Sequence, residues 1–134
     1  MKQLQREALA ADGVNVVRQW GGAFPDADVD GIADLFAADA TFFGTNGRKL
    51  VTEPEGIRSY FERALLQNRP RGAELLEHTA VVLSDTVVLV TGRDAVTGVK
   101  DGTPYRSEGR VSFILASRDG AWKIVHLHRS ALPD

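Results

Sequence analysis

The sequence predicts an α+β fold in which helices pack on one face of an antiparallel sheet. In the first half of the chain, apolar residues recur at spacings of three and four, the period of a helix with one buried stripe. After Gly72, apolar residues stand in short runs rich in valine and separated by turn residues, as in strands. Helices followed by a series of strands are typical of α+β domains. The 134 residues, 43% of them hydrophobic, suit one domain over residues 1–134.

Two helices are expected before any strand. The segment from Gln3 to Ala23 carries one apolar stripe and predicts a long first helix. Phe24-Pro25-Asp26 ends this helix, because proline breaks the hydrogen-bond ladder. Asp28 then begins a short second helix that continues toward Phe36, with the acidic start that the helix dipole favours.

A short hairpin is expected next. Ala40–Phe43 has strand-forming residues, and the turn-rich Gly44–Gly47 leads back to Lys49–Val51.

A third helix follows the hairpin. Thr52 and Glu55 have the spacing of a capping box, and Pro54 stands where proline is favoured at a helix start. The apolar spacing then predicts a helix that runs through Leu65.

Four antiparallel strands are expected in the second half. Their apolar runs are Ala80–Leu83, Val87–Val90, Val111–Leu115 and Trp122–His128. Asp119-Gly120 lies between the last two runs and predicts a tight hairpin turn, because both residues adopt positive φ readily.

Composition excludes several classes of function. With 16 basic and 18 acidic residues the net charge is −2, so the broad positive field of a nucleic-acid-binding protein is missing. The chain has no cysteine and therefore no disulfide or thiolate site. Its first residues lack the apolar core of a signal peptide, and no stretch is long enough to span a membrane. We therefore expect a cytoplasmic protein that binds neither nucleic acid nor membrane.

The last strand separates into two faces. Alternation places Trp122, Ile124, His126 and His128 on one side, and Val125, Leu127 and Arg129 on the other. The two histidines lack a third ligand, so no metal site is expected. Arg129 would point into an apolar space on a concave sheet, although the same spacing also fits a salt bridge at the rim.

Charged residues alternate along the two preceding strands. Arg106, Glu108 and Arg110 stand at every second position, a pattern that in one strand alone indicates a solvated face. Pairing of the strands would bring Arg93 near the Arg106 region. Several arginines together require a carboxylate or a ligand anion, and Glu108 and Asp94 supply part of that charge.

No catalytic motif is present, and no cofactor is expected. The sequence contains neither a G-x-S-x-G elbow, a phosphate-binding glycine loop nor H-E-x-x-H. Asp39 is the best lone carboxylate for general acid or base chemistry, because its aromatic neighbours would raise its pKa. A structural aspartate in a turn explains the same residue without any catalytic role.

The final segment supports a family resemblance. Arg118–Ser130 contains a D-G-x-W hairpin followed by H-x-H-R-S, and Pro133 comes soon after. This pattern resembles the association (hub) domain of calcium/calmodulin-dependent protein kinase II, and more broadly the nuclear transport factor 2-like proteins. The resemblance implies a cone in which a strongly bent sheet wraps a long helix. It also implies a pocket that Arg129 and Arg93 line, whereas Arg106 stands one place late and faces away unless a bulge intervenes.

A broader resemblance concerns Leu35–Thr41, which is similar to SgcJ/EcaC-type and polyketide cyclase-like (SnoaL-like) proteins, some of which act in polyketide or enediyne biosynthesis. The two resemblances lead to three hypotheses.

The first hypothesis is a homodimer that binds an anionic or oxygenated small molecule. Its predicted ligand-binding arginines are Arg93, Arg106 and Arg129, and its predicted apolar walls are Trp20, Phe43 and Tyr60. The second is a cofactor-independent isomerase, cyclase or hydrolase with Asp39 or Glu108 as proton acceptor. The third is a hub-like oligomerisation module. The apolar outer face of the sheet is expected to bury against a second subunit.

Overall fold

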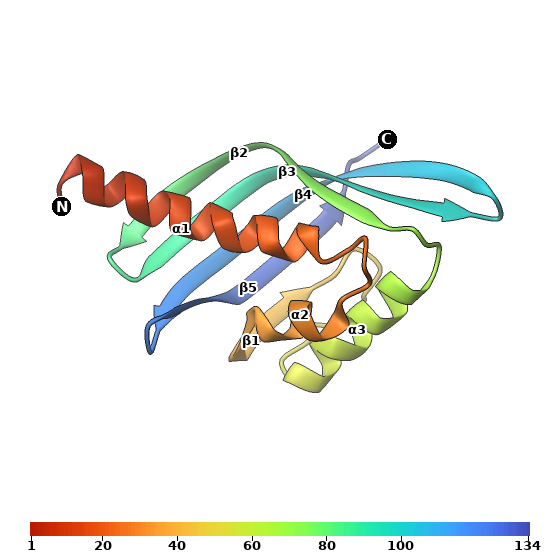
Figure 1. Cartoon of the computed structure of the whole chain (residues 1–134), viewed down its shortest axis with the longest axis horizontal. Coiled ribbons are helices and arrows are strands. Elements are labelled where there is room, and N and C mark those ends of the chain that lie inside the picture. Colours follow the sequence, from red (N-terminus) through yellow and green to blue (C-terminus); the bar gives the residue numbers. More distant parts are fainter.

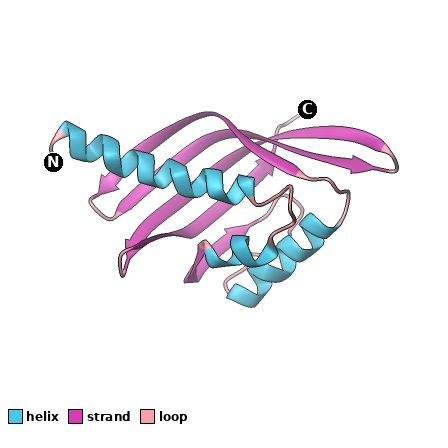
Figure 2. Ribbon diagram, viewed as in Figure 1, coloured by secondary structure: helices cyan, strands magenta, loops and turns pink.

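The computed structural model describes residues 1–134 and has the expected α+β architecture (Figures 1 and 2). Its elements in chain order are α1 (Gln3–Gly22), α2 (Val29–Asp34), β1 (Phe36–Phe43), α3 (Pro54–Leu66), β2 (Gly72–Ser84), β3 (Val87–Lys100), β4 (Thr103–Arg118) and β5 (Ala121–Ala131). None of the helices is both long and apolar enough to cross a membrane.

A side chain caps the start of α2 but not the start of α3. The Asp28 side chain caps α2 by accepting a hydrogen bond from the Gly31 N–H, as the acidic start predicted. At α3 the N-cap is Glu53 and no side chain caps the helix, so the expected capping box with Thr52 does not form. Pro54 in the first turn marks this helix start instead.

The sheet has five strands in the order β1-β5-β4-β3-β2. Neighbouring strands are antiparallel except β1, which pairs in parallel with β5. The expected hairpin from Ala40–Phe43 back to Lys49–Val51 is reduced to one bridge between Phe42 and Val51. The strand of that hairpin is therefore a fifth strand at the edge of the sheet, and its main partner comes from the end of the chain.

The strands of the second half extend far beyond their apolar runs. β3 continues to Lys100 and β4 begins at Thr103, so only Asp101 and Gly102 form the turn, both with positive φ. Asp119 and Gly120 form the next turn in the same way, as predicted. The additional residues pair through their backbones, and this pairing does not require apolar side chains.

The sheet curls around α1, which lies across its concave face, while α2 and α3 cover the end near β1 (Figure 1). Val16, Val17 and Trp20 of α1 are buried against the sheet. Phe61 and Phe113 belong to the same core, and their rings lie edge-on to the Trp20 indole. The open side of this cone holds the candidate site.

A bulge in β5 changes the faces that simple alternation predicted. Ile114 pairs with His126, but the next residue of β4, Leu115, pairs with Ile124, so Val125 is an extra residue. Ile124 consequently turns to the concave side, where it is fully buried. The prediction that Ile124 shares a face with His126 was therefore wrong, because one inserted residue shifts the alternation along the rest of the strand.

Candidate functional site

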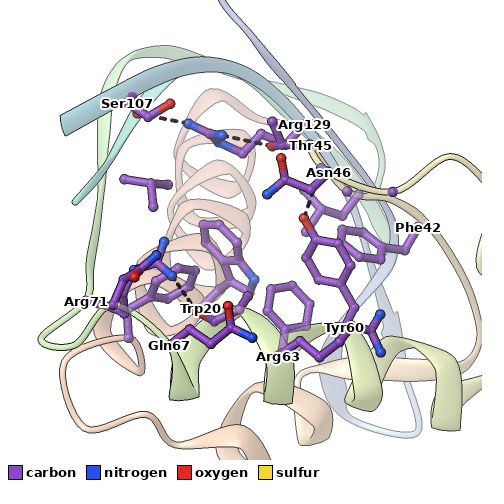
Figure 3. A pocket seen from close by; sticks show the side chains of 18 of the residues that line it. Trp20, Phe42, Thr45, Asn46, Tyr60, Arg63, Gln67, Arg71, Ser107 and Arg129 are labelled. Atoms are coloured by element: carbon purple, nitrogen blue, oxygen red, sulfur yellow. Dashed lines mark hydrogen bonds between the residues drawn. The ribbon is translucent and has the colours of Figure 1, made fainter. Parts of the chain in front are cut away.

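A cavity of about 540 Å³ opens between the C-terminal end of α1, α3, the loop after β1 and the far end of the β3–β4 hairpin (Figure 3). Its apolar wall includes Trp20, Phe24, Phe42, Phe61, Val96 and Leu127. Three arginines, Arg63, Arg71 and Arg129, also line it, and the wall contains no aspartate or glutamate. This volume lies within the range of small-molecule pockets in proteins.

Arg129 of β5 is held by a buried ion pair. Its Nε lies 2.9 Å from both carboxylate oxygens of Asp94 in β3, and its Nη2 lies 2.8 Å from Oδ1. Asp94 is 2% exposed and Arg129 is 9% exposed. Nη2 also donates to the Ser107 carbonyl at 3.1 Å. The guanidinium therefore has a single well-defined position in the cavity wall.

Gly109 of β4 makes room for this ion pair. A Cβ atom at position 109 would lie 2.5 Å from Nη2 of Arg129 and 2.6 Å from its Cζ. Because glycine has no side chain, the guanidinium can lie over β4 and join β5 to β3.

The loop after β1 is fixed from two sides. Thr45 Oγ1 accepts a hydrogen bond of 2.8 Å from Nη1 of Arg129, and the Asn46 N–H lies 3.5 Å from the Tyr60 hydroxyl of α3. The ring of Tyr60 packs so closely on Gly44 that a Cβ there would lie 2.3 Å from it. Figure 3 shows Arg129, Thr45, Asn46 and Tyr60 along one side of the cavity.

Arg71 lines another side of the cavity, away from Arg129 and the loop after β1. Its Nε donates to the Thr97 carbonyl at 3.0 Å, its Nη1 donates to the Ala64 carbonyl, and its guanidinium lies over the Tyr105 ring at 5.9 Å. Neither Arg71 nor the exposed Arg63 forms an ion pair with a carboxylate. Their positive charges are not neutralised within the protein.

Three of the residues predicted to bind ligand lie in this cavity wall. They are Arg129, Trp20 and Tyr60, and their role in binding stays a prediction. The Trp20 indole is 5% exposed, and its Nε1 has no hydrogen-bond acceptor in the structure.

Arg93, Arg106 and Glu108 lie on the opposite, convex face of the sheet. Arg93 Nη1 lies 2.7 Å from a Glu108 oxygen, and Arg106 Nη1 lies 3.2 Å from the other. The β3–β4 pairing runs without a bulge, so nothing turns Arg106 toward the cavity. Arg93 also binds Glu77, and this contact raises the pKa of its guanidinium. The structure thus places these three residues outside the cavity. Arg106 and Glu108 form the solvated ion pair that alternation along their strand indicated, and Arg93 joins them from β3.

Phe43 and Asp39 also lie outside the cavity. The Phe43 ring packs against the His128 ring on the convex face, with 5.2 Å between the ring centroids. Its neighbour Phe42 faces the cavity instead. Asp39 is exposed and hydrogen-bonded to Arg118, which lowers the pKa of its carboxyl. The expectation that aromatic neighbours would raise this pKa was wrong, because the side chain points to solvent and to a cation.

The cavity contains residues that the sequence analysis missed. Arg63, Arg71, Thr45 and Phe42 belong to segments that meet only in the folded chain. Phe42 pairs with Leu127 of β5, and this pairing joins segments far apart in the chain, so no local pattern indicated that Phe42 faces the cavity. Arg71 stands between a helix and a strand, where periodicity does not indicate a direction.

The side chains that could bind a metal ion do not form a cluster. No group of three or more histidine, aspartate or glutamate side chains is arranged to hold a metal ion. His126 and His128 face the convex side, where His126 Nδ1 lies 2.7 Å from Thr41 Oγ1.

Comparisons with solved structures support the cone fold. A protein from Xanthomonas campestris assigned as a calcium/calmodulin-dependent protein kinase II association domain superposes with a TM-score of 0.84 at 25% identity, over 90% of this chain and 86% of that one. The association domain of the C. elegans kinase gives 0.79 at 20% identity, over 93% and 97%. A type 2 hexachlorocyclohexane dehydrochlorinase gives 0.82 at 17% identity, over 98% and 90%.

The sequence comparison identifies the family. No curated protein matches the chain. The family model of the SnoaL-like domain matches residues 14–134, which is nearly all of the α+β cone described above. The chain therefore belongs to the SnoaL-like domain family.

Proposed function

We propose that this protein binds a small organic anion with an apolar body in the cavity between α1, α3 and the ends of β3 and β4. One observation carries the proposal: the cavity wall contains no carboxylate, and two of its three arginines, Arg63 and Arg71, form no ion pair. A bound carboxylate would be the first counter-charge that Arg71 meets, because Arg71 donates only to backbone carbonyls and forms no ion pair.

The remaining wall suits the apolar part of such a ligand. Trp20, Phe42 and Phe61 offer aromatic surface, and the volume of about 540 Å³ is typical of sites for small molecules. Each hydrogen bond between arginine and a carboxylate contributes about 1.5–3 kcal/mol before desolvation is deducted. An oxygenated, polyketide-like acid has the chemistry that this wall would recognise.

Isothermal titration calorimetry with phenylbutyrate and its uncharged amide tests the proposal. We expect the acid to bind at least about tenfold more tightly than the amide, since tenfold corresponds to about 1.4 kcal/mol. Arg71→Gln should abolish most of this difference. Arg93→Gln removes one arginine from the convex face and is the matched control, which should bind like wild type. Equal binding of acid and amide, across a panel of aryl and alkyl acids, would reject the proposal.

We further propose that the protein is a homodimer through the convex face of the sheet. Val81, Leu89 and Ile114 stand side by side in one row of that face on β2, β3 and β4. Val81 is 44% exposed, so the row offers apolar surface that a second copy would cover. A symmetric pairing of this kind is the commonest form of oligomer.

A further inference from the structure

We propose that the ligand is a carboxylic acid that also carries a carbonyl oxygen. The carbonyl would lie against Arg129, Thr45 and Tyr60, which we call the donor corner, and the carboxylate would lie against Arg71. This inference rests on the proposed function and specifies the ligand class of the same cavity.

The hydrogen-bond donors of Arg129 are almost, but not fully, satisfied by the protein. A guanidinium has five N–H hydrogens. The Nε hydrogen is directed to Asp94, the two on Nη2 to Asp94 and the Ser107 carbonyl, and one on Nη1 to Thr45. One Nη1 hydrogen remains without an acceptor, on a guanidinium that lines the cavity.

The two hydroxyl groups of the donor corner also have hydrogens to donate. Thr45 Oγ1 accepts from Arg129, which has no acceptor atom, so the threonine hydrogen must find another partner. The Tyr60 oxygen lies within reach only of the Asn46 N–H, which is itself a donor. The phenolic hydrogen is therefore also free. Three donors from β5, the loop after β1 and α3 thus remain for an acceptor atom in the cavity.

The charge of the donor corner distinguishes it from the Arg71 side. The positive charge of Arg129 is offset at 2.8 Å by Asp94, a carboxylate that is almost fully buried. A corner with several donors and no net charge matches a neutral carbonyl oxygen, which accepts hydrogen bonds without requiring a counter-ion. A carboxylate gains more from the guanidinium of Arg71, whose charge no carboxylate offsets.

The donor corner and Arg71 line the same cavity. In Figure 3, Arg129 and Thr45 lie on one side of the opening and Arg71 on another, with the Trp20 indole between them. The Trp20 N–H is buried without an acceptor, so this wall leaves donors rather than acceptors unsatisfied. A ligand whose carbonyl and carboxylate are separated by an apolar segment complements this order of groups.

Three related ligands separate the two contacts. Benzoylpropionate carries both groups, phenylbutyrate lacks the carbonyl, and benzoylpropionamide lacks the charge. Two or three homologues with shorter or longer spacers allow for the distance between the groups. We expect benzoylpropionate, or its best-fitting homologue, to bind about tenfold more tightly than its methylene analogue, the gain of one or two satisfied donors.

Variants assign each preference to its own side of the cavity. Thr45→Val with Tyr60→Phe removes two of the three donors, so it should reduce the preference for the carbonyl several-fold and leave the preference for acid over amide intact. Arg71→Gln should have the opposite pattern. Tyr105→Phe removes a cavity hydroxyl beside Arg71 and is the matched control, which should retain the carbonyl preference. Thr45→Ser, with Tyr60 unchanged, keeps a hydroxyl at position 45 and should retain part of the carbonyl preference. Thermal melting of each variant verifies that it folds.

The outcomes separate this inference from the proposed function. If no acid binds in preference to its amide, the proposed function fails and this inference fails with it. If acids bind but the carbonyl confers no gain, or if the gain survives undiminished in the double variant, only the carbonyl assignment is overturned. If the double variant removes the acid preference while Arg71→Gln retains it, the carboxylate lies in the donor corner and the inference is wrong.

Discussion

The guanidinium of Arg129 in β5 lies over Gly109 of β4 and forms a buried ion pair with Asp94 of β3, at 2.8 Å between Nη2 and Oδ1. One interaction therefore joins two strands that are not neighbours in the sheet. It also decides the electrostatic character of the cavity, because it neutralises the most buried of the three arginines in the wall. The stability of the sheet and the chemistry of the candidate site depend on the same pair.

Replacement of Asp94 by asparagine should destabilise the protein strongly. The substitution leaves the buried guanidinium without a counter-charge, and removal of one partner of a buried pair costs about 3–5 kcal/mol. Urea unfolding measures the loss. Glu77→Gln breaks an exposed pair with Arg93 and serves as the control, with an expected loss below about 1 kcal/mol. Similar losses for both variants would contradict a structural role of the buried pair.

Gly109→Ala should displace Arg129. The new Cβ would lie 2.5 Å from Nη2 and 2.8 Å from the Ser130 carbonyl oxygen, a contact that the backbone cannot easily relieve. We expect a loss of about 1–3 kcal/mol in unfolding free energy, together with weaker binding of acids that carry a carbonyl. Gly22→Ala is the control, because no atom lies within 4 Å of its added Cβ. An unchanged melting temperature for Gly109→Ala would show that the pair tolerates a side chain there.

Two glycines of the loop after β1 should respond differently to alanine. At Gly44 the added Cβ would lie 2.3 Å from the Tyr60 ring, whereas at Gly47 the nearest atom is 3.7 Å away. Gly44→Ala must therefore move Tyr60 and should weaken ligand binding several-fold, by about 1 kcal/mol. Gly47→Ala, in the same loop, should bind like wild type. Calorimetry decides the matter, and equal affinities would mean that the position of Tyr60 does not affect the cavity.

Acidification should destabilise the protein through His126. Burial, followed by the charge of neighbouring His128, lowers the pKa of His126. The unfolded chain then binds a proton more readily than the folded one, so stability is greatest above the ordinary histidine pKa of about 6.5 and falls as the pH drops below it. In His126→Gln, melting temperatures between about pH 7 and pH 5 should decline less steeply than in wild type. His128→Gln should reduce the slope partially, and a slope unaffected by His126→Gln would assign the acid sensitivity to other groups.

A charge on the convex face should prevent dimer formation. Ile114 lies in the apolar row of that face, opposite Leu89, so Ile114→Lys should yield a monomer if this row is the interface. Light scattering coupled to size-exclusion chromatography measures the mass. Leu4→Lys is the control, since Leu4 is 80% exposed on α1. A wild-type monomer, or a dimer that survives Ile114→Lys, would exclude this interface.

Local sequence signals predicted most elements of the fold. The spacing of apolar residues located α1 and α3, Asp28 marked the start of α2, and Asp119-Gly120 marked a turn. Each of these signals acts within a few residues, so it can be recognised without the rest of the chain. The parallel pairing of β1 with β5 has no such signal, because it joins segments about 85 residues apart, as in Thr41 and His126.

The directions of charged side chains were harder to predict. All four residues of Val87–Val90 are apolar, so alternation did not reveal which face Arg93 shares. Val88 and Val90 face the core, and this places Arg93 on the convex side with Glu77 and Glu108.

By itself, the sequence determined the α+β class and the order of helices and strands, and its alternation placed Arg129 on the same face as Leu127. Only the tertiary structure decided that Arg129 is neutralised by Asp94, that Arg71 and Thr45 share its cavity, and that Arg93 and Arg106 do not. The reason is physical: helix and turn formation depends on neighbouring residues, whereas charge compensation and cavity walls depend on which distant strands meet and on single-residue bulges that reverse a face.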